Sequence, residues 1–128
     1  MMNRTDRLVI GTRGSPLALV QARMVAGLLA AVTPLATGIL TIRTTGDAIT
    51  DRPLLEVGGK GLFTKEIDEA LLDGRADLAV HSMKDLPTRL PDGITVAAVL
   101  ERADPRAVLL DHGATSLGQL PRGTVVGT

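Results

Sequence analysis

The sequence predicts an α/β fold, because apolar segments of strand length alternate with segments that carry helix signals. Polar clusters follow several of the apolar segments, which is where open α/β sheets place their ligands. The chain has 128 residues, of which 45% are hydrophobic, and this is enough for one buried core. We therefore expect one α/β domain, alone or with a fragment of a second, in a chain with neither internal repeats nor low-complexity tracts.

The first strand and helix are predicted from their junction. Residues 8–12 form a short apolar strand, which Arg13 and Gly14 turn into a helix. Ser15 is the expected N-cap of that helix, and Pro16 occupies its first position. Four apolar residues repeat at helical spacing and are expected to face the sheet: Leu17, Val20, Met24 and Leu28.

The next elements continue the alternation. Residues 39–44 read as a second strand, followed by a polar turn at 45–47. Residues 62–73 predict a helix that ends at Gly74, and 77–82 predict a third strand. The side chains expected to point inward from this helix are those of Leu62, Ile67, Leu71 and Leu72.

The composition changes after Glu101. Pro87 and Pro91 predict a rigid turn into a strand at 94–100, the last element expected of a first domain over residues 1–100. The expected start of a second domain, 101–128, is too short for a core of its own. It is predicted to contain strands at 107–110 and 124–126 and a short helix at 116–120.

Composition excludes several functions. Fourteen basic residues balance fourteen acidic ones, and the chain has one Phe with no Tyr or Trp, so nucleic-acid binding is not expected. The absence of Cys removes disulfides, thiolate metal sites and thiol nucleophiles. Residues 24–42 carry no charge, but Pro34 would break a membrane-spanning helix, and the polar residues 1–7 do not resemble a secretory signal.

Two polar clusters favour anion binding. Arg13 and Ser15 combine a guanidinium, a hydroxyl and a helix N-terminus, which suits a carboxylate or phosphate, although both are also ordinary turn and capping residues. The glycine-rich stretch 58–61 exposes backbone beside Lys60. It is not a phosphate-binding Walker A loop, because Gly61 follows Lys60 where Ser or Thr is required.

A third cluster follows the strand at 77–82. Lys84 and Asp85 place a cation beside an anion on a loop that Pro87 makes rigid, an arrangement that suits a charged ligand but also occurs as a simple surface pair. His81 is interpreted as structural. His112 has no companion at metal-ligand spacing, so we expect no metal.

Five stretches together resemble the porphobilinogen deaminase family, also called hydroxymethylbilane synthases. They occur in the family's order and extend over nearly the whole chain. The stretches are 10–22 (IGTRGSPLALVQA), 44–47 (TTGD), 58–66 (GGKGLFTKE), 76–87 (ADLAVHSMKDLP) and 102–106 (RADPR).

The resemblance implies a cytoplasmic transferase of tetrapyrrole (haem) biosynthesis that condenses four porphobilinogen molecules into hydroxymethylbilane and releases ammonia each time. It also implies a dipyrromethane cofactor held by a cysteine thioether, and a monomeric full-length enzyme. The implied fold is a domain like those of type II periplasmic binding proteins, with a mixed sheet, followed by the start of a second similar domain.

The resemblance also assigns roles to residues of this chain. Asp85 matches the catalytic carboxylate, which holds pyrrole nitrogens and stabilises the methylene-pyrrolenine cation formed as ammonia leaves. The carboxylate side chains of substrate and cofactor are expected to be bound by Arg13, Ser15, Ser82, Lys84 and Thr128. Lys60 and Phe63 belong to the active-site loop.

The chain departs from the family in three respects. Family members are more than twice as long, the cofactor-bearing Cys lies in a third domain that this sequence lacks, and Glu56 stands where some relatives have a second loop Lys. We therefore expect an N-terminal fragment, in which the first domain lacks its returning segment, that is inactive alone and prone to self-association. Two other hypotheses are a non-catalytic carboxylate-binding module and an oligomerising remnant with a structural role.

Overall fold

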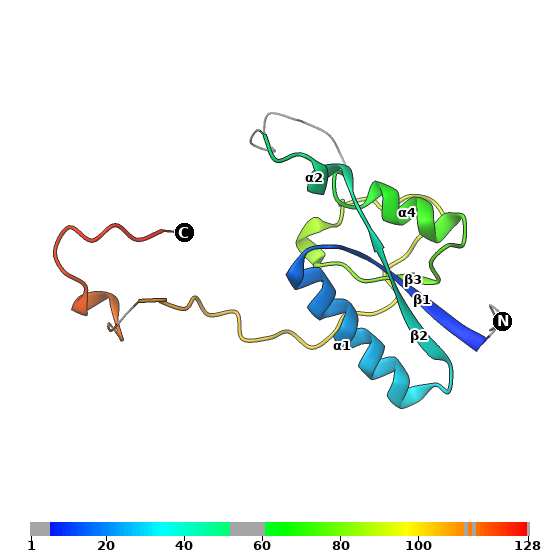
Figure 1. Cartoon of the computed structure of the whole chain (residues 1–128), viewed down its shortest axis with the longest axis horizontal. Coiled ribbons are helices and arrows are strands. Elements are labelled where there is room, and N and C mark those ends of the chain that lie inside the picture. Colours follow the sequence, from blue (N-terminus) through cyan, green and yellow to red (C-terminus); the bar gives the residue numbers. More distant parts are fainter. Residues whose placement is uncertain (1–5, 52–60, 112, 114, 128) are drawn as a thin grey trace. The chain divides into compact units, whose positions relative to one another are not determined.

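The computed structural model describes residues 6–51, 61–111, 113 and 115–127 (Figure 1). The chain divides into two compact units, Met1–Thr95 and Val96–Thr128. Within the described part of the second unit, the regular element is a short 3-10 helix, η3 (Leu117–Gln119). All the polar clusters described below belong to the first unit.

A three-stranded parallel sheet forms the centre of the first unit. Strand β1 (Arg7–Arg13) lies between β2 (Ala36–Ile42) and the short β3 (Leu78–Ala79). Its full length pairs with β2, from Arg7 opposite Ala36 to Arg13 opposite Ile42. Because the strands are parallel, their carboxyl ends lie at the same edge of the sheet.

Helices pack on both faces of this sheet. The side chain of Thr12 reaches the backbone of α1 (Pro16–Val32), and its hydroxyl donates to the Ala18 carbonyl at 3.4 Å. On the opposite face, a Cβ at Gly11 would lie 3.7 Å from Ile67 on α4 (Lys65–Leu72). Since neighbouring residues of a strand face opposite sides, the domain has three layers with the sheet between α1 and α4 (Figure 1).

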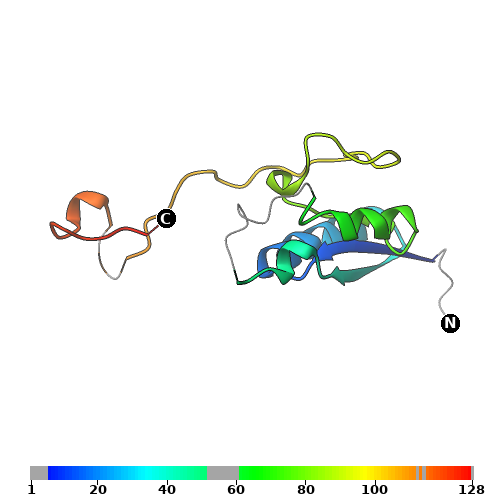
Figure 2. The ribbon, with the colours of Figure 1, turned by 90° about the horizontal axis from the view of Figure 1, so that it is seen from above.

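The buried core lies mainly on the α4 side. Ile67 is fully buried there, and the segment after the loop at 83–92 returns alongside this helix, where Gly93 lies close to Leu72 (Figure 2). The core cluster consists of Ile42, Ile67, Ala70 and Ala76. On the other face, Ala22 of α1 is fully buried.

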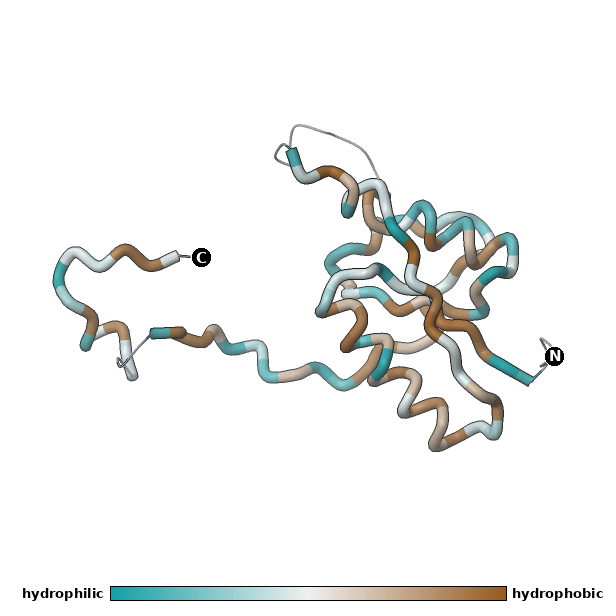
Figure 3. The backbone as a smooth tube through the Cα atoms, viewed as in Figure 1, coloured by the Kyte–Doolittle hydropathy of each residue, from teal (hydrophilic) through white to brown (hydrophobic). Residues whose placement is uncertain are grey.

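The sequence prediction for the buried face of α1 is wrong. Ala22 is the fully buried residue of this helix, whereas the four residues expected to face the sheet are each at least half exposed: Leu17, Val20, Met24 and Leu28. The reason is that α1 is apolar almost all round, with Gln21 and Arg23 as its polar exceptions (Figure 3). Periodicity therefore could not distinguish its two sides, and the small Ala22 permits closer approach to the sheet.

Several other elements differ from expectation. Residues 45–48 form a short helix, α2 (Thr45–Ala48), and not a turn, while Leu72 points outward with 57% of its surface exposed. In the described part of the chain, no strand occurs at 94–100, 107–110 or 124–126. The two strand pairs of the described sheet, β1 with β2 and β1 with β3, are both parallel, whereas a mixed sheet was expected. A strand is stable only when it pairs with others, and among the described residues the sheet contains β2, β1 and β3 alone, so 94–100 has no partner there.

None of the described helices combines the length and the hydropathy that crossing a bilayer would require. This agrees with the expectation that Pro34 interrupts the uncharged stretch: α1 ends at Val32, and the extended Thr33 caps it.

Candidate functional site

Three segments distant in sequence bring charged side chains together at the carboxyl edge of the sheet. Arg13 is the last residue of β1, Asp47 lies on α2 after β2, and Asp85 ends the 3-10 helix η2 (Met83–Asp85) after β3. A fourth segment, just before α4, contributes Phe63. Arg13 is the centre of this cluster, because it contacts each of the other three side chains.

The guanidinium of Arg13 is held by two carboxylates. Nε donates to both carboxylate oxygens of Asp47 at 3.2 Å, and Nη2 donates to Asp47 Oδ1 at 2.5 Å. Nη1 donates to Asp85 Oδ2 at 3.1 Å. The guanidinium carbon also lies 4.1 Å from the centre of the Phe63 ring, within the range of a cation–π contact.

The electrostatics follow from these contacts. The hydrogen bond from Arg13 holds the pKa of Asp47 below its ordinary value, and bonds from Thr44 act in the same direction against the effect of burial. In return, Asp47 raises the pKa of Arg13. Both side chains are about one-fifth exposed, so the pair is shielded from solvent but open to a ligand.

Backbone contacts fix the segments that carry Asp47 and Phe63. Thr44, which is buried, caps α2 by accepting from the Asp47 N–H at 3.3 Å. The N–H of Gly46 donates to the Leu62 carbonyl at 2.7 Å, and that of Thr45 donates to Glu66 at 2.9 Å. The start of α2 is thereby tied to the turn that leads into α4.

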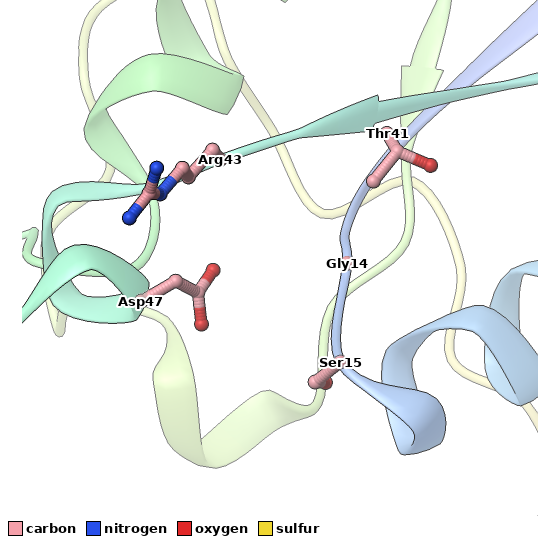
Figure 4. Close-up of a pocket in the computed structure, with 5 residues that line it drawn as sticks. All are labelled: Gly14, Ser15, Thr41, Arg43 and Asp47. Carbon is pink, nitrogen blue, oxygen red and sulfur yellow. The ribbon is translucent and has the colours of Figure 1, made fainter. Parts of the chain in front are cut away.

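A pocket of about 360 Å³ opens beside this cluster and is lined by Gly14, Ser15, Thr41, Arg43 and Asp47 (Figure 4). Ser15 has the ordinary capping role, because its Oγ accepts from the Ala18 N–H at 3.3 Å, and it also lines the pocket. Arg43 was missed in the sequence, although it directly follows β2. Its side chain adds a cation to the wall of the pocket opposite Gly14 and Ser15.

A second pocket, of about 550 Å³, is lined by Gly61 and residues 85–92. The side chain of Lys84 is exposed. The neighbouring Asp85 forms its ion pair with Arg13. The Ser82 hydroxyl donates to Gln21 on α1 at 3.0 Å. Asp85 therefore borders a pocket that a ligand can enter.

The structure brings Arg13, Phe63 and Asp85 into one cluster and places Ser15 beside it through Asp47. Ser82 turns toward α1. Two further residues singled out in the sequence, Lys60 and Thr128, lie outside the described residues.

His81 lies near the cluster, next to β3. Both of its ring nitrogens are buried without a hydrogen-bond partner among the described residues. Burial lowers the pKa of His81, while the carboxylates of Asp68 and Asp85 act in the opposite direction. In the described part of the chain, no group of three metal-ligating side chains comes together.

The fold and the site define an α/β domain with a charged cluster at the carboxyl ends of parallel strands, built around an arginine between two aspartates. The family model of porphobilinogen deaminase, dipyromethane cofactor binding domain, matches residues 8–128. The chain belongs to the porphobilinogen deaminase family.

Curated relatives agree with this assignment. The chain is 60% identical over 122 residues to the porphobilinogen deaminase of Syntrophomonas wolfei, a match that covers 94% of this chain and 40% of the relative. It is 58% identical to that of Nitrobacter winogradskyi, covering 98% and 41% of the two chains. The chloroplastic enzyme of Oryza sativa is 56% identical, covering 93% and 35%. The chain thus spans about 40% of the length of these relatives.

Proposed function

We propose that this chain supplies the catalytic aspartate and much of the carboxylate-binding surface of a porphobilinogen deaminase, a transferase that joins four porphobilinogen molecules into hydroxymethylbilane with release of ammonia. The observation that carries the proposal is the Arg13–Asp85 contact, which places a cation and an anion together in a domain of this family. Condensation of this kind needs both charges, since the substrate carries two carboxylates and its reacting carbon becomes electron-poor as ammonia leaves.

Asp85 is the residue proposed to meet that electron-poor pyrrole. It lines the pocket formed with Gly61 and residues 86–92, and Arg13 Nη1 donates to its Oδ2 at 3.1 Å. A fixed carboxylate stabilises developing positive charge without having to reorganise during the reaction. The pyrrole N–H groups are the donors that Asp85 would accept from.

Cations around Asp85 are proposed to bind the acetate and propionate groups. Arg13 is half-buried, Lys84 is exposed, and the exposed Arg43 reaches the pocket beside Ser15. A guanidinium suits a carboxylate by its planar pair of donors, whereas the ammonium of Lys84 acts as a point charge. Arg13 would therefore orient the substrate carboxylate, and Lys84 would attract it by charge.

The residues present also fit a dipyrromethane. Its carboxylates match the cations that line the two pockets, Arg43 in the first and Arg89 in the second, and the Phe63 ring offers an apolar surface beside Arg13. When bound, this cofactor supplies the pyrrole end on which porphobilinogen units are added. The sequence contains no Cys, so this chain holds the cofactor by charge and contact, and the thioether must come from elsewhere.

Three further assignments belong to the proposal. The domain is proposed to be of the type II periplasmic-binding-protein kind, which the central parallel sheet with helices on both faces supports. The complete enzyme is proposed to be monomeric and to act in the cytoplasm on porphobilinogen. The boundary between the first and second domains is proposed to lie near residue 100.

The test is turnover by a full-length protein made by joining residues 1–128 to the remaining part of the Syntrophomonas wolfei relative. Porphobilinogen consumption with formation of hydroxymethylbilane is the expected result. The 128-residue chain alone, which lacks a Cys, is the matched control and should neither turn over substrate nor gain covalent mass. Tight porphobilinogen binding by the full-length protein without any turnover would contradict the proposal in favour of a non-catalytic binding module.

A further inference from the structure

Asp47 belongs to a sequence stretch that the proposed catalytic and binding residues do not include, yet it makes the most extensive contact in the site. Its carboxylate spans the Nε and Nη2 edge of Arg13, with three donor–acceptor distances between 2.5 and 3.2 Å. A side-on pair of this kind fixes the plane of a guanidinium as well as its position.

Asp47 is itself fixed from the protein side. The Thr44 hydroxyl donates to Asp47 Oδ2 at 2.8 Å, and Thr44 is only 1% exposed. The same hydroxyl accepts from the Asp47 N–H, so carboxylate and backbone are both tied to one buried side chain. Asp47 therefore offers Arg13 a rigid partner rather than a mobile surface carboxylate.

The contacts of Arg13 leave little of its guanidinium free. Asp47 takes the Nε–H and one N–H of Nη2, and Asp85 takes one N–H of Nη1. Because a guanidinium has five N–H groups, one remains on each terminal nitrogen. Phe63 covers one side of the plane at 4.1 Å. The direction of these two remaining donors is thus set by Asp47.

We propose that Asp47 is a positioning residue, which aims the free end of the Arg13 guanidinium at a ligand carboxylate while Arg13 holds Asp85. This inference rests on the proposed function, since it concerns the same site. Asp47 also lines the pocket beside Ser15 and Arg43, but the role proposed for it is exerted through Arg13. A purely structural role, as a tie between α2 and β1, is the alternative that an experiment must separate from it.

The kinetic test uses the full-length protein described above. Asp47→Asn keeps the shape but removes the negative charge, and it replaces one carboxylate oxygen with an NH2 group that cannot accept from Arg13. The KM for porphobilinogen should rise by about tenfold or more, with a fall in kcat, because misdirected groups commonly cost up to about 100-fold. Asp47→Glu, which restores the carboxylate, should recover part of the loss. Glu69→Gln removes an exposed carboxylate from α4 and serves as the control, with unchanged kinetics.

A second measurement needs no substrate. In ¹⁵N-resolved NMR spectra of the 128-residue chain, the Arg13 Nε–H should give a signal separated from those of the other arginines in the parent and in Glu69→Gln, and lose that separation in Asp47→Asn. An unchanged Arg13 signal in Asp47→Asn would overturn the proposal. A fall in the melting temperature of Asp47→Asn with KM and kcat at parental values would also overturn the proposal. If the unsubstituted full-length protein shows no turnover, the proposed function fails, and the NMR result still decides whether Asp47 directs Arg13.

Discussion

The ring of Phe63 lies directly on the backbone of Gly46. A Cβ added at residue 46 would lie 2.3 Å from Phe63 Cε1, far closer than two carbon atoms can approach. The same ring contacts the Arg13 guanidinium, so it lies between the start of α2 and the charged cluster. Glycine at position 46 is therefore what permits the ring to lie beside Arg13.

Gly46→Ala should displace the Phe63 ring and release one side of Arg13. We expect a loss of about 1 kcal/mol in the free energy of unfolding, because the ring can rotate away but loses its cation–π contact. Urea unfolding measures the loss, and the ring-current shift of the Arg13 Hδ protons reports the contact. Gly27→Ala is the control: a Cβ there meets nothing within 4 Å, and the helical position should gain about 0.5–1 kcal/mol. Equal effects of the two substitutions would contradict this account of Gly46.

Asp85→Asn tests the proposed catalytic carboxylate in the full-length protein. The substitution preserves shape but removes the negative charge, so turnover should fall by roughly 10²- to 10³-fold, the scale for losing one preorganised electrostatic group. Circular dichroism should show a folded protein. Undiminished turnover of porphobilinogen by this variant would remove Asp85 from the catalytic role.

Lys84→Met and Arg13→Leu should differ in their effect on stability. Lys84 is exposed, so its loss should weaken substrate use while the free energy of unfolding stays within about 0.5 kcal/mol. Arg13→Leu leaves Asp47 and Asp85 without their shared cation, and should lower both stability and activity. Thermal melting measured beside turnover separates the two; a large drop in melting temperature for Lys84→Met would mean that Lys84 has a structural role.

Asp47 should make the free energy of unfolding fall as the pH is lowered into the acid range. Its pKa lies below the ordinary value in the folded chain, chiefly because Arg13 donates to it. A carboxylate of this kind contributes stability above its unfolded pKa of about 3.9, and the contribution is lost as the pH falls through the lower folded value. Asp47→Asn should therefore be less stable than the parent at pH 7, with a difference that shrinks below about pH 4. Urea unfolding at a series of pH values checks this, and a constant difference would contradict it.

Asp68 should show the opposite dependence. Burial raises its pKa, and the opposing effects of Thr64 and His81 do not cancel that rise. The favourable contribution of protonated Asp68 to the free energy of unfolding is thus fully present below about pH 3.9, and it is lost as the pH rises through the folded pKa. Asp68→Asn should be more stable than the parent at pH 7, and the gain should disappear in acid. A loss of stability at pH 7 would show instead that the Asp68 charge is needed beside His81.

Local signals in the sequence were sufficient for β1, α1 and the junction between them. Ser15 and Pro16 marked the start of α1 correctly, because capping depends on residues next to one another. The buried side of α1 was not predictable in the same way. Almost every other residue of α1 is apolar, with Gln21 and Arg23 as the exceptions, and only contact with the sheet shows that Ala22 is the residue that packs.

Several residues of the site were predictable from the local sequence, but their contacts with one another were not. Arg13 and Asp85 were recognisable as charged residues at strand ends, but their direct contact depends on β1 and β3 being neighbours, which local sequence does not encode. Asp47 stood in a recognised stretch without a role, because its function exists only relative to Arg13. Arg43 fell inside the strand predicted at 39–44, whereas β2 ends at Ile42, so its position at a strand end was not predicted.

The Arg13–Asp85 contact joins residues that are 72 positions apart, and Arg13–Asp47 joins residues 34 apart. Loops of these lengths must close before either contact can form, so the charged cluster is completed only when the sheet has assembled. An unfolded chain then has no site at all. Any ligand of the cluster must act as a stabiliser of the fold, and its concentration will shift the unfolding equilibrium of residues that lie far from it.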